Sequence, residues 1–257
     1  MSRRRKPHLR CAGCRMHRSL CICALLPRLE TRTRVVLLLH QLEIVKPTNT
    51  GVVAARCLAN SAVVYRGRAP DEEAAHGDEG ADAALADESA GGASIDEQAA
   101  RLSAAVAPGT RAAFLFPHPS ATPLTEWRGD PPVTLIVPDG TWSQSARARS
   151  RLGRALGWPC VSLPLDQQAA GAGVGRLRTP TRPGRLATLE ALAFALGVLE
   201  GPEIEAELMR VYRVMTDRTL WTNGRLPREA VTGGVPEDVR SHDPLGERHA
   251  RRTLEEP

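Results

Sequence analysis

The sequence predicts an α/β fold in which a mostly parallel sheet is flanked by helices. Short apolar runs alternate along the chain with longer stretches of helical periodicity, and this alternation is typical of parallel sheets. The β-branched run Val133–Val137 has the composition of a buried strand. A Pro-Asp-Gly turn ends that run, and a helix opens directly after it. With 257 residues, the chain can bury the core of a single α/β domain with attachments.

The first half of the chain begins with a basic arm, residues 1–10. The side chains of Thr48-Asn49-Thr50-Gly51 supply capping chemistry for a helix that reaches about Asn60. Residues 68–97 are rich in Ala, Gly, Asp and Glu and have little to bury, so they are predicted to form an acidic, disordered insertion. Strands are predicted at residues 35–40 and 62–65, and a further helix at residues 96–106.

In the second half, capping signals mark where each helix begins. Thr141 and Gln144 have the Thr-x-x-Gln spacing of a capping box. Glu190 lies in the first turn of the next helix, where an acid is favourable against the helix dipole, and Pro202 opens the last helix. The predicted strands are residues 112–116, 133–137 and 160–163, and the predicted helices follow Thr141, span residues 185–199 and start at Pro202.

Asp139 and Trp142 are the candidate catalytic residues. They follow the predicted strand 133–137 at its carboxyl end, and open α/β sheets bind ligands at that edge. Asp139 brings a carboxylate to this edge, and Trp142 brings an aromatic ring. The alternative is an ordinary turn beside a tryptophan that packs in the core, and the sequence leaves both open.

Arginines on the helix after this turn form a candidate nucleic-acid contact. Arg147, Arg151 and Arg154 are spaced i, i+4 and i+7, so they share one stripe; the alternative is a solvated face. Residues 143–185 carry eight arginines and one acid, and residues 1–34 carry ten Arg or Lys and one acid. Two basic regions in a chain of net charge +5 indicate a polyanionic partner such as nucleic acid.

Four of the six cysteines form a cluster with the spacing C-x2-C-x6-C-x-C: Cys11, Cys14, Cys21 and Cys23. In a reducing compartment, this set predicts a closed tetrahedral zinc site. A segment this short has no core of its own, so the metal would supply its folding free energy. Redox-active thiols, an iron–sulfur cluster and chance clustering are the alternatives.

No apolar run approaches the about 20 residues that a membrane span needs, and the basic N-terminus lacks the apolar region of a signal peptide. The chain is therefore expected to be cytoplasmic and away from membranes, and no obligatory protein partner is evident. Three regions are predicted: a basic arm with the zinc-binding segment at residues 1–30, a catalytic domain at residues 31–221, and a charged, disordered tail at residues 222–257.

These motifs, taken in order, make the chain resemble the DTW-domain family, which includes the tRNA-uridine aminocarboxypropyltransferases. The resemblance runs from about Cys11 to Leu199. Two stretches depart from the family pattern, the acidic segment 68–97 and His118-Pro119-Ser120. After the cysteine cluster, the matching pieces are the strand that ends in His40, Glu43, Lys46-Pro47-Thr48-Asn49-Thr50-Gly51, Leu115-Phe116-Pro117, Asp139-Gly140-Thr141-Trp142, Arg176-Leu177-Arg178 and Thr188-Leu189-Glu190-Ala191.

The resemblance implies a trefoil-knotted domain similar to the SPOUT superfamily, with S-adenosylmethionine as co-substrate and tRNA as partner. The loops after successive strands would bind the donor. The implied donor-binding residues are Leu115, Phe116, Pro117, Asp139, Gly140, Thr141, Arg178 and Thr188. The implied RNA-binding residues are Lys46, Asn49, Arg147, Arg151 and Arg154.

The implied reaction moves the 3-amino-3-carboxypropyl group of S-adenosylmethionine to N3 of a tRNA uridine and releases methylthioadenosine. Asp139 would hold the ammonium of the donor or take the N3 proton, and Trp142 would stack on the adenine or the target base. The target uridine would have to leave its stack. A SPOUT-type RNA methyltransferase and a non-enzymatic zinc-ribbon RNA-binding protein are the alternative functions.

Overall fold

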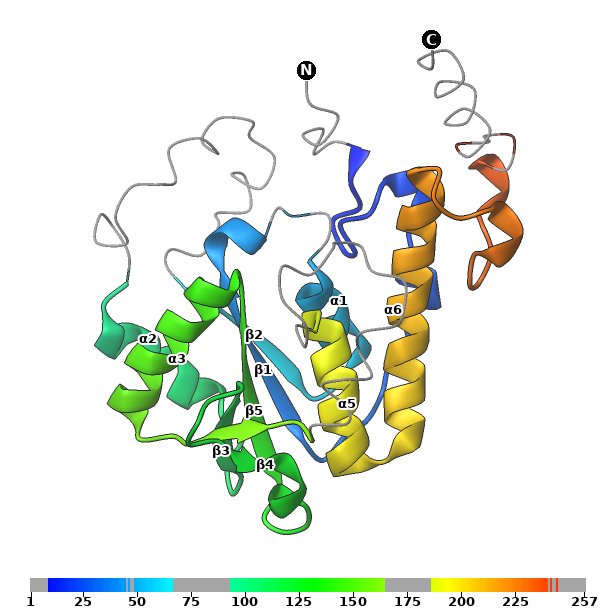
Figure 1. The fold of residues 1–257 in the computed structure, drawn as a ribbon. Helices are drawn as coiled ribbons and strands as arrows, with labels where there is room; N and C mark the ends of the chain where they lie inside the picture. Colours follow the sequence, from blue (N-terminus) through cyan, green and yellow to red (C-terminus); the bar gives the residue numbers. More distant parts are fainter. Residues whose placement is uncertain are drawn as a thin grey trace.

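The computed structural model describes residues 9–44, 46, 49–66, 93–164, 186–239, 241 and 244. Within this part of the chain, the strands form one six-stranded sheet in the order β2-β1-β5-β3-β6-β4 (Figure 1). Every neighbouring pair is parallel, which confirms the predicted α/β fold with a parallel sheet. The strands are β1 (Arg34–His40), β2 (Ser61–Arg66), β3 (Arg111–Leu115), β4 (Thr122–Pro123), β5 (Val133–Asp139) and β6 (Cys160–Ser162).

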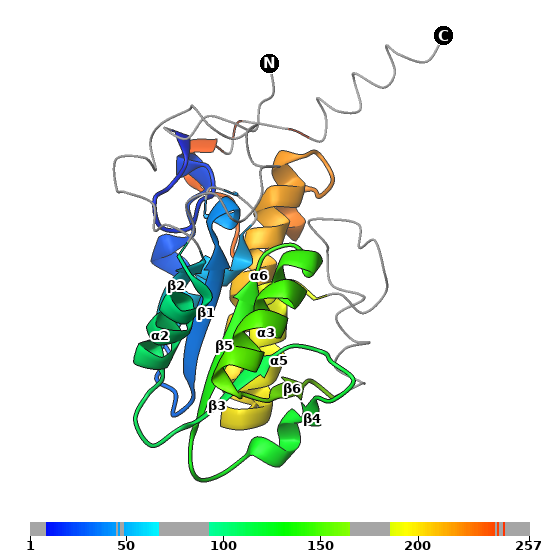
Figure 2. The same ribbon diagram turned by 90° about the vertical axis from the view of Figure 1, so that its left-hand side faces the viewer.

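Helices cover both faces of the sheet and give the molecule three layers. Figure 1 shows α2 and α3 on one face and α1, α5 and α6 on the other, and Figure 2 agrees for α2, α3, α5 and α6. The helices are α1 (Thr50–Cys57), α2 (Ile95–Ala105), α3 (Trp142–Leu156), α5 (Thr188–Glu200) and α6 (Pro202–Thr222).

Alternate side chains of each strand enter the two cores. Val35, Leu37 and Leu39 of β1 pack in the core beneath α1, α5 and α6. Val36 and Leu38 pack in the core beneath α2 and α3. All five side chains are fully buried, and a strand covered on both faces is therefore a continuous apolar run.

The central strand β5 lies between β1 and β3. Val133, Leu135 and Val137 enter the core beneath α1, α5 and α6, and Asp139 continues the same side of the strand. Leu39 and Asp139 are partners in the register of β1 and β5, so the carboxyl ends of these strands finish side by side. Crevices at such an edge, where the strand order reverses, bind ligands in open α/β sheets.

Most predicted elements are confirmed, with differences at their ends. Helix α1 ends at Cys57 rather than near Asn60, because Leu58 is extended and bridges Leu29. Helix α2 begins at Ile95 with Ser94 as its N-cap, so the last residues assigned to the insertion belong to a helix. Residues 68–92 of that insertion and the predicted loop Gly171–Gly175 lie outside the described residues.

The chain beyond α6 folds back on the molecule, contrary to the predicted disorder from residue 222. Thr232 donates to Asp217 Oδ2 of α6 from its backbone N–H (3.1 Å) and from its hydroxyl (2.6 Å). Val231 and Val235 are buried in the core. The polar composition of the segment conceals these two apolar anchors, and the described part of it, up to residue 239, is therefore ordered.

The cysteine-bearing segment packs into the main core rather than forming a separate unit. Cys14 and Ile22 are fully buried and, with Leu20, belong to the core cluster beneath α6. Arg218 of α6 donates to the carbonyl oxygens of Leu20 (3.3 Å) and Cys21 (2.9 Å). The segment is thus tied to the last long helix by both apolar packing and hydrogen bonds.

A knot is a property of the uninterrupted chain path. Residues 165–185, between β6 and α5, lie outside the described part of the chain, so the knot implied by the resemblance stays a prediction. Among the described helices, none combines the length and the apolar character needed to cross a membrane.

Candidate functional site

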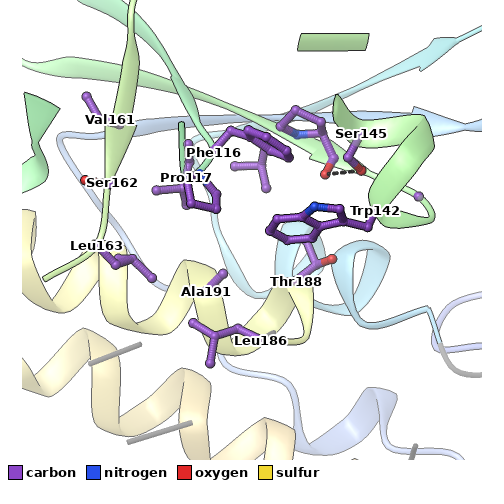
Figure 3. A pocket seen from close by; sticks show the side chains of 14 residues that line it. Phe116, Pro117, Trp142, Ser145, Val161, Ser162, Leu163, Leu186, Thr188 and Ala191 are labelled. Atoms are coloured by element: carbon purple, nitrogen blue, oxygen red, sulfur yellow. Dashed lines mark hydrogen bonds between the residues drawn. The ribbon is translucent and has the colours of Figure 1, made fainter. Parts of the chain in front are cut away.

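A pocket opens at the carboxyl ends of β3, β5 and β6, and the start of α5 closes one of its sides (Figure 3). Its walls are mostly apolar, and hydroxyl groups come from Ser145, Ser162 and Thr188. Apolar walls with a few convergent polar groups are typical of small-molecule sites. The lining residues are Leu115, Phe116, Pro117, Val137, Pro138, Gly140, Trp142, Ser145, Val161, Ser162, Leu163, Leu186, Thr188 and Ala191.

Trp142, the first residue of α3, forms one wall of the pocket (Figure 3). Its ring centroid lies 5.1 Å from that of Phe116, with the two planes tilted by 33°. Trp142 is 42% exposed, more than any other large apolar residue in the described part of the chain. A partly exposed ring at a pocket wall offers a stacking surface to a planar ligand group.

The capping box predicted at the start of α3 is confirmed, and it fixes the position of Trp142. Thr141 Oγ1 accepts from the backbone N–H of Gln144 (3.3 Å), and Gln144 Oε1 accepts from the backbone N–H of Thr141 (2.8 Å). The side chain of Thr141 is therefore occupied in capping the helix, and Thr141 does not line the pocket.

Asp139 lies directly behind the pocket and joins three segments. Its Oδ1 accepts from the hydroxyl of Thr188 at the start of α5 (2.7 Å). Its Oδ2 accepts from the side-chain amide of Asn49 (2.8 Å), just before α1. Asp139 is 8% exposed and is not among the lining residues, whereas Thr188 is. The carboxylate of Asp139 therefore does not line the pocket itself but contacts the hydroxyl group of Thr188, which does.

The environment of Asp139 shifts its protonation equilibrium. Burial raises the pKa of the Asp139 carboxyl group, and the hydrogen bonds from Thr188 and Asn49 only partly oppose that rise. The negative charge of Glu43 raises the pKa further, and the positive charge of Lys46 lowers it. Glu43 and Lys46 form an ion pair with each other.

Close contacts hold the start of α1 against Asp139 and α5. A Cβ atom added at Gly51 would lie 2.7 Å from Asp139 Oδ2, so only glycine fits there without a shift. Thr50 Oγ1 accepts from the backbone N–H of Leu189 in α5 (3.3 Å). Asn49 caps α1, because its Oδ1 accepts from the backbone N–H of Val52 (2.9 Å). The predicted capping role of this segment is confirmed.

Some of the predicted donor-binding residues line the pocket, and others do not. Asp139 stands behind the pocket and Thr141 caps α3. Arg178 lies outside the described residues. The predicted residues that line the pocket are Leu115, Phe116, Pro117, Gly140 and Thr188, together with Trp142, and their binding of the donor stays a prediction.

Sequence reasoning missed several residues of the pocket, among them Ser145, Ser162 and Ala191. Helical spacing was an available signal for two of them. Ser145 follows Trp142 by three positions on α3, and Ala191 follows Thr188 by three positions on α5, so each pair shares a helix face.

The predicted RNA-binding residues differ in their exposure to solvent. Arg147, Arg151 and Arg154 are exposed along α3, the helix that starts at the pocket. Lys46 is partly buried and paired with Glu43. Asn49 differs from expectation: it is buried and its amide binds Asp139 and the start of α1. An RNA backbone has no access to it in this arrangement.

The four clustered thiols meet the geometric requirements of a metal site. Their sulfur atoms all lie within 4.8 Å of one another. The sulfur–sulfur distances are 3.4 Å for Cys21 and Cys11, 3.6 Å for Cys11 and Cys23, and 3.8 Å for Cys14 and Cys21. Four thiolates at about 2.3 Å from a tetrahedral zinc ion would be about 3.8 Å apart. The cluster could therefore hold one zinc ion with little rearrangement.

The pKa of the Cys11 thiol lies below its ordinary value. Burial raises the pKa of its thiol, but hydrogen bonds from the backbone of Cys14, the side chain of Cys21 and the backbone of Gly13 outweigh that effect and bring the pKa to about 6. Metals bind the thiolate form of cysteine, whereas burial raises the pKa of the Cys14 thiol and raises that of the Cys23 thiol to about 12. A metal ion would therefore have to displace protons from these two ligands.

Comparison with known proteins supplies the family. The sequence model of the DTW domain matches residues 8–220. The chain belongs to the DTW-domain family. The matched residues include the cysteine cluster and the residues that line the pocket, and the match ends near the end of α6. No curated protein and no solved structure matches the chain. Membership of the DTW-domain family supports a role in tRNA modification in general.

Proposed function

We propose that this DTW-domain protein transfers the 3-amino-3-carboxypropyl group of S-adenosylmethionine to N3 of a uridine in tRNA. The observation that carries the proposal is the pocket at the carboxyl ends of β3, β5 and β6. Its apolar walls and the ring of Trp142 suit the adenine and the methylthio group of the donor, and its few hydroxyl groups suit the polar atoms of the donor.

The reaction is a displacement at carbon. The uridine N3 forms a bond to the γ-carbon of the aminocarboxypropyl arm, and the bond between that carbon and the sulfonium sulfur breaks. Methylthioadenosine leaves with the electron pair, and the N3 proton passes to solvent or to a basic group. The same sulfonium can also lose its methyl group, so the orientation of the donor selects the product.

The tRNA would lie across the side of the molecule onto which the pocket opens. Helix α3 begins at the pocket wall and carries the exposed Arg147, Arg151 and Arg154. The cysteine-bearing segment lies toward the same side, at the carboxyl ends of the strands (Figure 1). Arginines on these elements would position the RNA through its phosphates, whereas the pocket would receive the extruded base.

A structural zinc ion would hold the cysteine-bearing segment in shape. The four thiols fit tetrahedral coordination. A site made of four protein ligands leaves no position for substrate, so the ion would support folding rather than the transfer reaction.

The deciding experiment follows two labels in parallel. Purified protein is incubated with unmodified tRNA and S-adenosylmethionine labelled either in the carboxyl group or in the methyl group. Aminocarboxypropyl transfer places the carboxyl label in the tRNA, leaves the methyl label in a nucleoside product and releases methylthioadenosine. A reaction without tRNA is the control for donor breakdown.

The other outcomes would replace the proposal. Methyl label in the tRNA, with S-adenosylhomocysteine as product, would make the protein an RNA methyltransferase. Tight binding of tRNA by a protein that does not bind S-adenosylmethionine would favour a non-enzymatic RNA-binding role.

A further inference from the structure

Two hydroxyl groups of the pocket direct their protons into the protein. Thr188 Oγ1 donates to Asp139 Oδ1 (2.7 Å), and Ser145 Oγ donates to the carbonyl oxygen of Pro138 (3.2 Å) (Figure 3). A hydroxyl group has one proton to donate and retains lone pairs that accept. At these two positions the pocket therefore offers acceptors to a ligand.

Thr188 differs from Ser145 because a carboxylate stands behind it. Asp139 is buried, and Asn49 donates to its other oxygen (2.8 Å). With one oxygen held by Asn49 and the other by Thr188, the carboxylate has a fixed orientation. When Asp139 is ionised, its negative charge reaches the pocket through the polarised hydroxyl of Thr188, at a site where burial weakens solvent screening.

We propose that Thr188, backed by Asp139, binds the primary ammonium group of the ligand. This inference rests on the proposed function, in which that group belongs to the amino-acid arm of S-adenosylmethionine. An acceptor with a negative charge behind it favours a cation that donates hydrogen bonds. The sulfonium has no proton to donate, and the adenine amino group has no charge. Thr188 is thus the contacting residue and Asp139 the positioning residue.

The dipole of α5 opposes a cation at this place, because a helix N-terminus carries partial positive charge. Two features reduce that opposition. The backbone N–H of Leu189 donates to Thr50 Oγ1 (3.3 Å), and that of Ala187 donates to Glu190 Oε2 (2.8 Å). The carboxyl groups of Asp139 and Glu190 both lie at this end of the helix. The local field is therefore more negative than that of a bare helix start.

Thr188→Val tests the inference, because valine keeps the shape of threonine and removes the hydroxyl group. The probes are S-adenosylmethionine, S-adenosylhomocysteine, which keeps the ammonium but lacks the sulfonium, and methylthioadenosine, which lacks the arm. We expect this substitution to weaken binding of the first two by about tenfold or more, the usual scale for a hydrogen bond to a charged group. Binding of methylthioadenosine should change by less than about twofold.

Two further variants separate ligand recognition from folding. Thr188→Ser retains the hydroxyl group and should restore most of the lost affinity. Asp139→Asn should reproduce the selectivity pattern of Thr188→Val although residue 139 does not line the pocket. Thermal unfolding of each variant, followed by circular dichroism, identifies the temperature range in which all of them are folded.

The remaining outcomes overturn the inference. An equal loss for all three ligands would mean that Thr188 only shapes the pocket. A loss confined to S-adenosylmethionine would mean that the sulfonium is recognised, and unchanged affinities would mean that the hydroxyl contacts nothing. Wild-type protein that binds none of the three would overturn the proposed function itself, and with it this inference.

Discussion

Asp139 is a residue at which burial and hydrogen bonding act against each other. Removal from water raises the pKa of its carboxyl group, whereas Thr188 and Asn49 stabilise the charged form by donating hydrogen bonds. Burial is the larger effect, so the pKa in the folded protein lies above the ordinary value of 3.8. A charged group held in such a place costs folding free energy, and that cost depends on pH.

The sign of this dependence follows from linkage. The folded state holds the Asp139 proton more tightly than the unfolded state does. The contribution of protonated Asp139 to the free energy of unfolding is therefore fully present below pH 3.8, and it is lost as pH rises through the raised pKa. Asp139→Asn removes the titration. We predict that the free energy of unfolding of wild type, relative to this variant, falls as pH rises from about 4 toward neutral. Urea unfolding of both proteins across this range measures the difference, and parallel curves would contradict the raised pKa.

Gly51 and Gly153 provide a matched pair of helical glycines. Alanine usually stabilises a helix interior by up to about 1 kcal/mol relative to glycine. At Gly51, however, a Cβ would lie 2.7 Å from Asp139 Oδ2 and 3.0 Å from Leu37 Cδ1. At Gly153 the nearest atoms are 3.7 Å away, an ordinary contact.

We predict that Gly51→Ala destabilises the protein by about 1–3 kcal/mol, because overpacking exceeds the gain in helix propensity. Gly153→Ala should stabilise it by about 0.5–1 kcal/mol. Chemical denaturation of the two variants measures both effects. If Gly51→Ala were as stable as Gly153→Ala, the close approach of α1 to Asp139 would be wrong.

At the residue scale, the sequence predicted which residues lie at or beside the pocket better than it predicted their contacts. Strand alternation alone places Asp139 on the side of Val133, Leu135 and Val137. It does not reveal that α1 and α5 cover that side, because this depends on the order of the strands. The contact with Asn49, ninety positions away, has no local signal in the sequence.

At the scale of elements, α3 connects the pocket to the basic surface. Trp142 opens the helix at the pocket, and Arg147, Arg151 and Arg154 are exposed along it. Ala148 and Leu152 form a neighbouring stripe of the same helix and pack in the core against the sheet. An RNA held by the arginines would therefore be placed at a fixed distance from the pocket.

Replacement of Arg147, Arg151 and Arg154 by Ala is predicted to weaken tRNA binding and to lower its salt dependence, by about one unit of slope for each phosphate that the variant no longer neutralises. Affinity for S-adenosylmethionine should stay the same, because none of the three lines the pocket. Arg213→Ala is the matched control, since Arg213 is exposed on α6 in the opposite layer. Filter binding at several salt concentrations measures the slopes. An unchanged slope in the triple variant would make the stripe a solvated face.

Long apolar runs made the main strands predictable, and capping residues made the starts of the helices predictable. The hydrophobic pattern did not predict elements that are too short or too polar to show the periodicity of a strand or a helix. Strand β4 has two residues, and the segment after α6 is anchored by Val231 and Val235 within a polar stretch. Those two elements are determined by contacts with distant parts of the chain.

The anchors of this last segment are predicted to contribute to stability. Val231→Ala and Val235→Ala each remove buried methyl groups and should lower the free energy of unfolding by about 1–2 kcal/mol. Glu229→Ala, an exposed position in the same segment, should change it by less than about 0.5 kcal/mol. Thermal unfolding compares the three variants, and equal melting temperatures would show that the segment does not pack on α6.

At the scale of the whole molecule, the cysteine-bearing segment and the sheet share one core. Cys14 and Ile22 are buried in the same cluster as Leu37 of β1. Arg218 is buried on α6 and donates to carbonyl oxygens of this segment and, through Nε, to that of Gly234 (3.2 Å). A zinc ion with four thiolates would carry a net charge of about −2, which would offset the buried positive charge of Arg218.

Zinc removal is therefore predicted to destabilise the whole domain rather than the N-terminal segment alone. Purified protein should contain about one zinc ion per chain, and a strong chelator should lower the melting temperature of the entire transition. Cys14→Ser should have the same effect, because Cys14 provides both a ligand and a buried core residue. The chain has four tryptophans, so the measurement uses a variant in which Trp127, Trp142 and Trp158 are replaced by Phe. In that variant Trp221, buried at the end of α6, reports on this region by fluorescence, and circular dichroism reports on the whole fold.

A control variant, and a comparison of the fluorescence and circular dichroism transitions, test whether zinc stabilises the whole domain. Cys160→Ala changes a buried thiol outside the cluster and should leave the zinc content unchanged. If the segment and the sheet form one cooperative unit, fluorescence and circular dichroism should shift together in the chelated protein. A separate low-temperature transition seen only by fluorescence would make the segment an independent unit. Stoichiometric iron in place of zinc would contradict the assignment of the metal, while zinc loss without any change in melting would contradict its structural role.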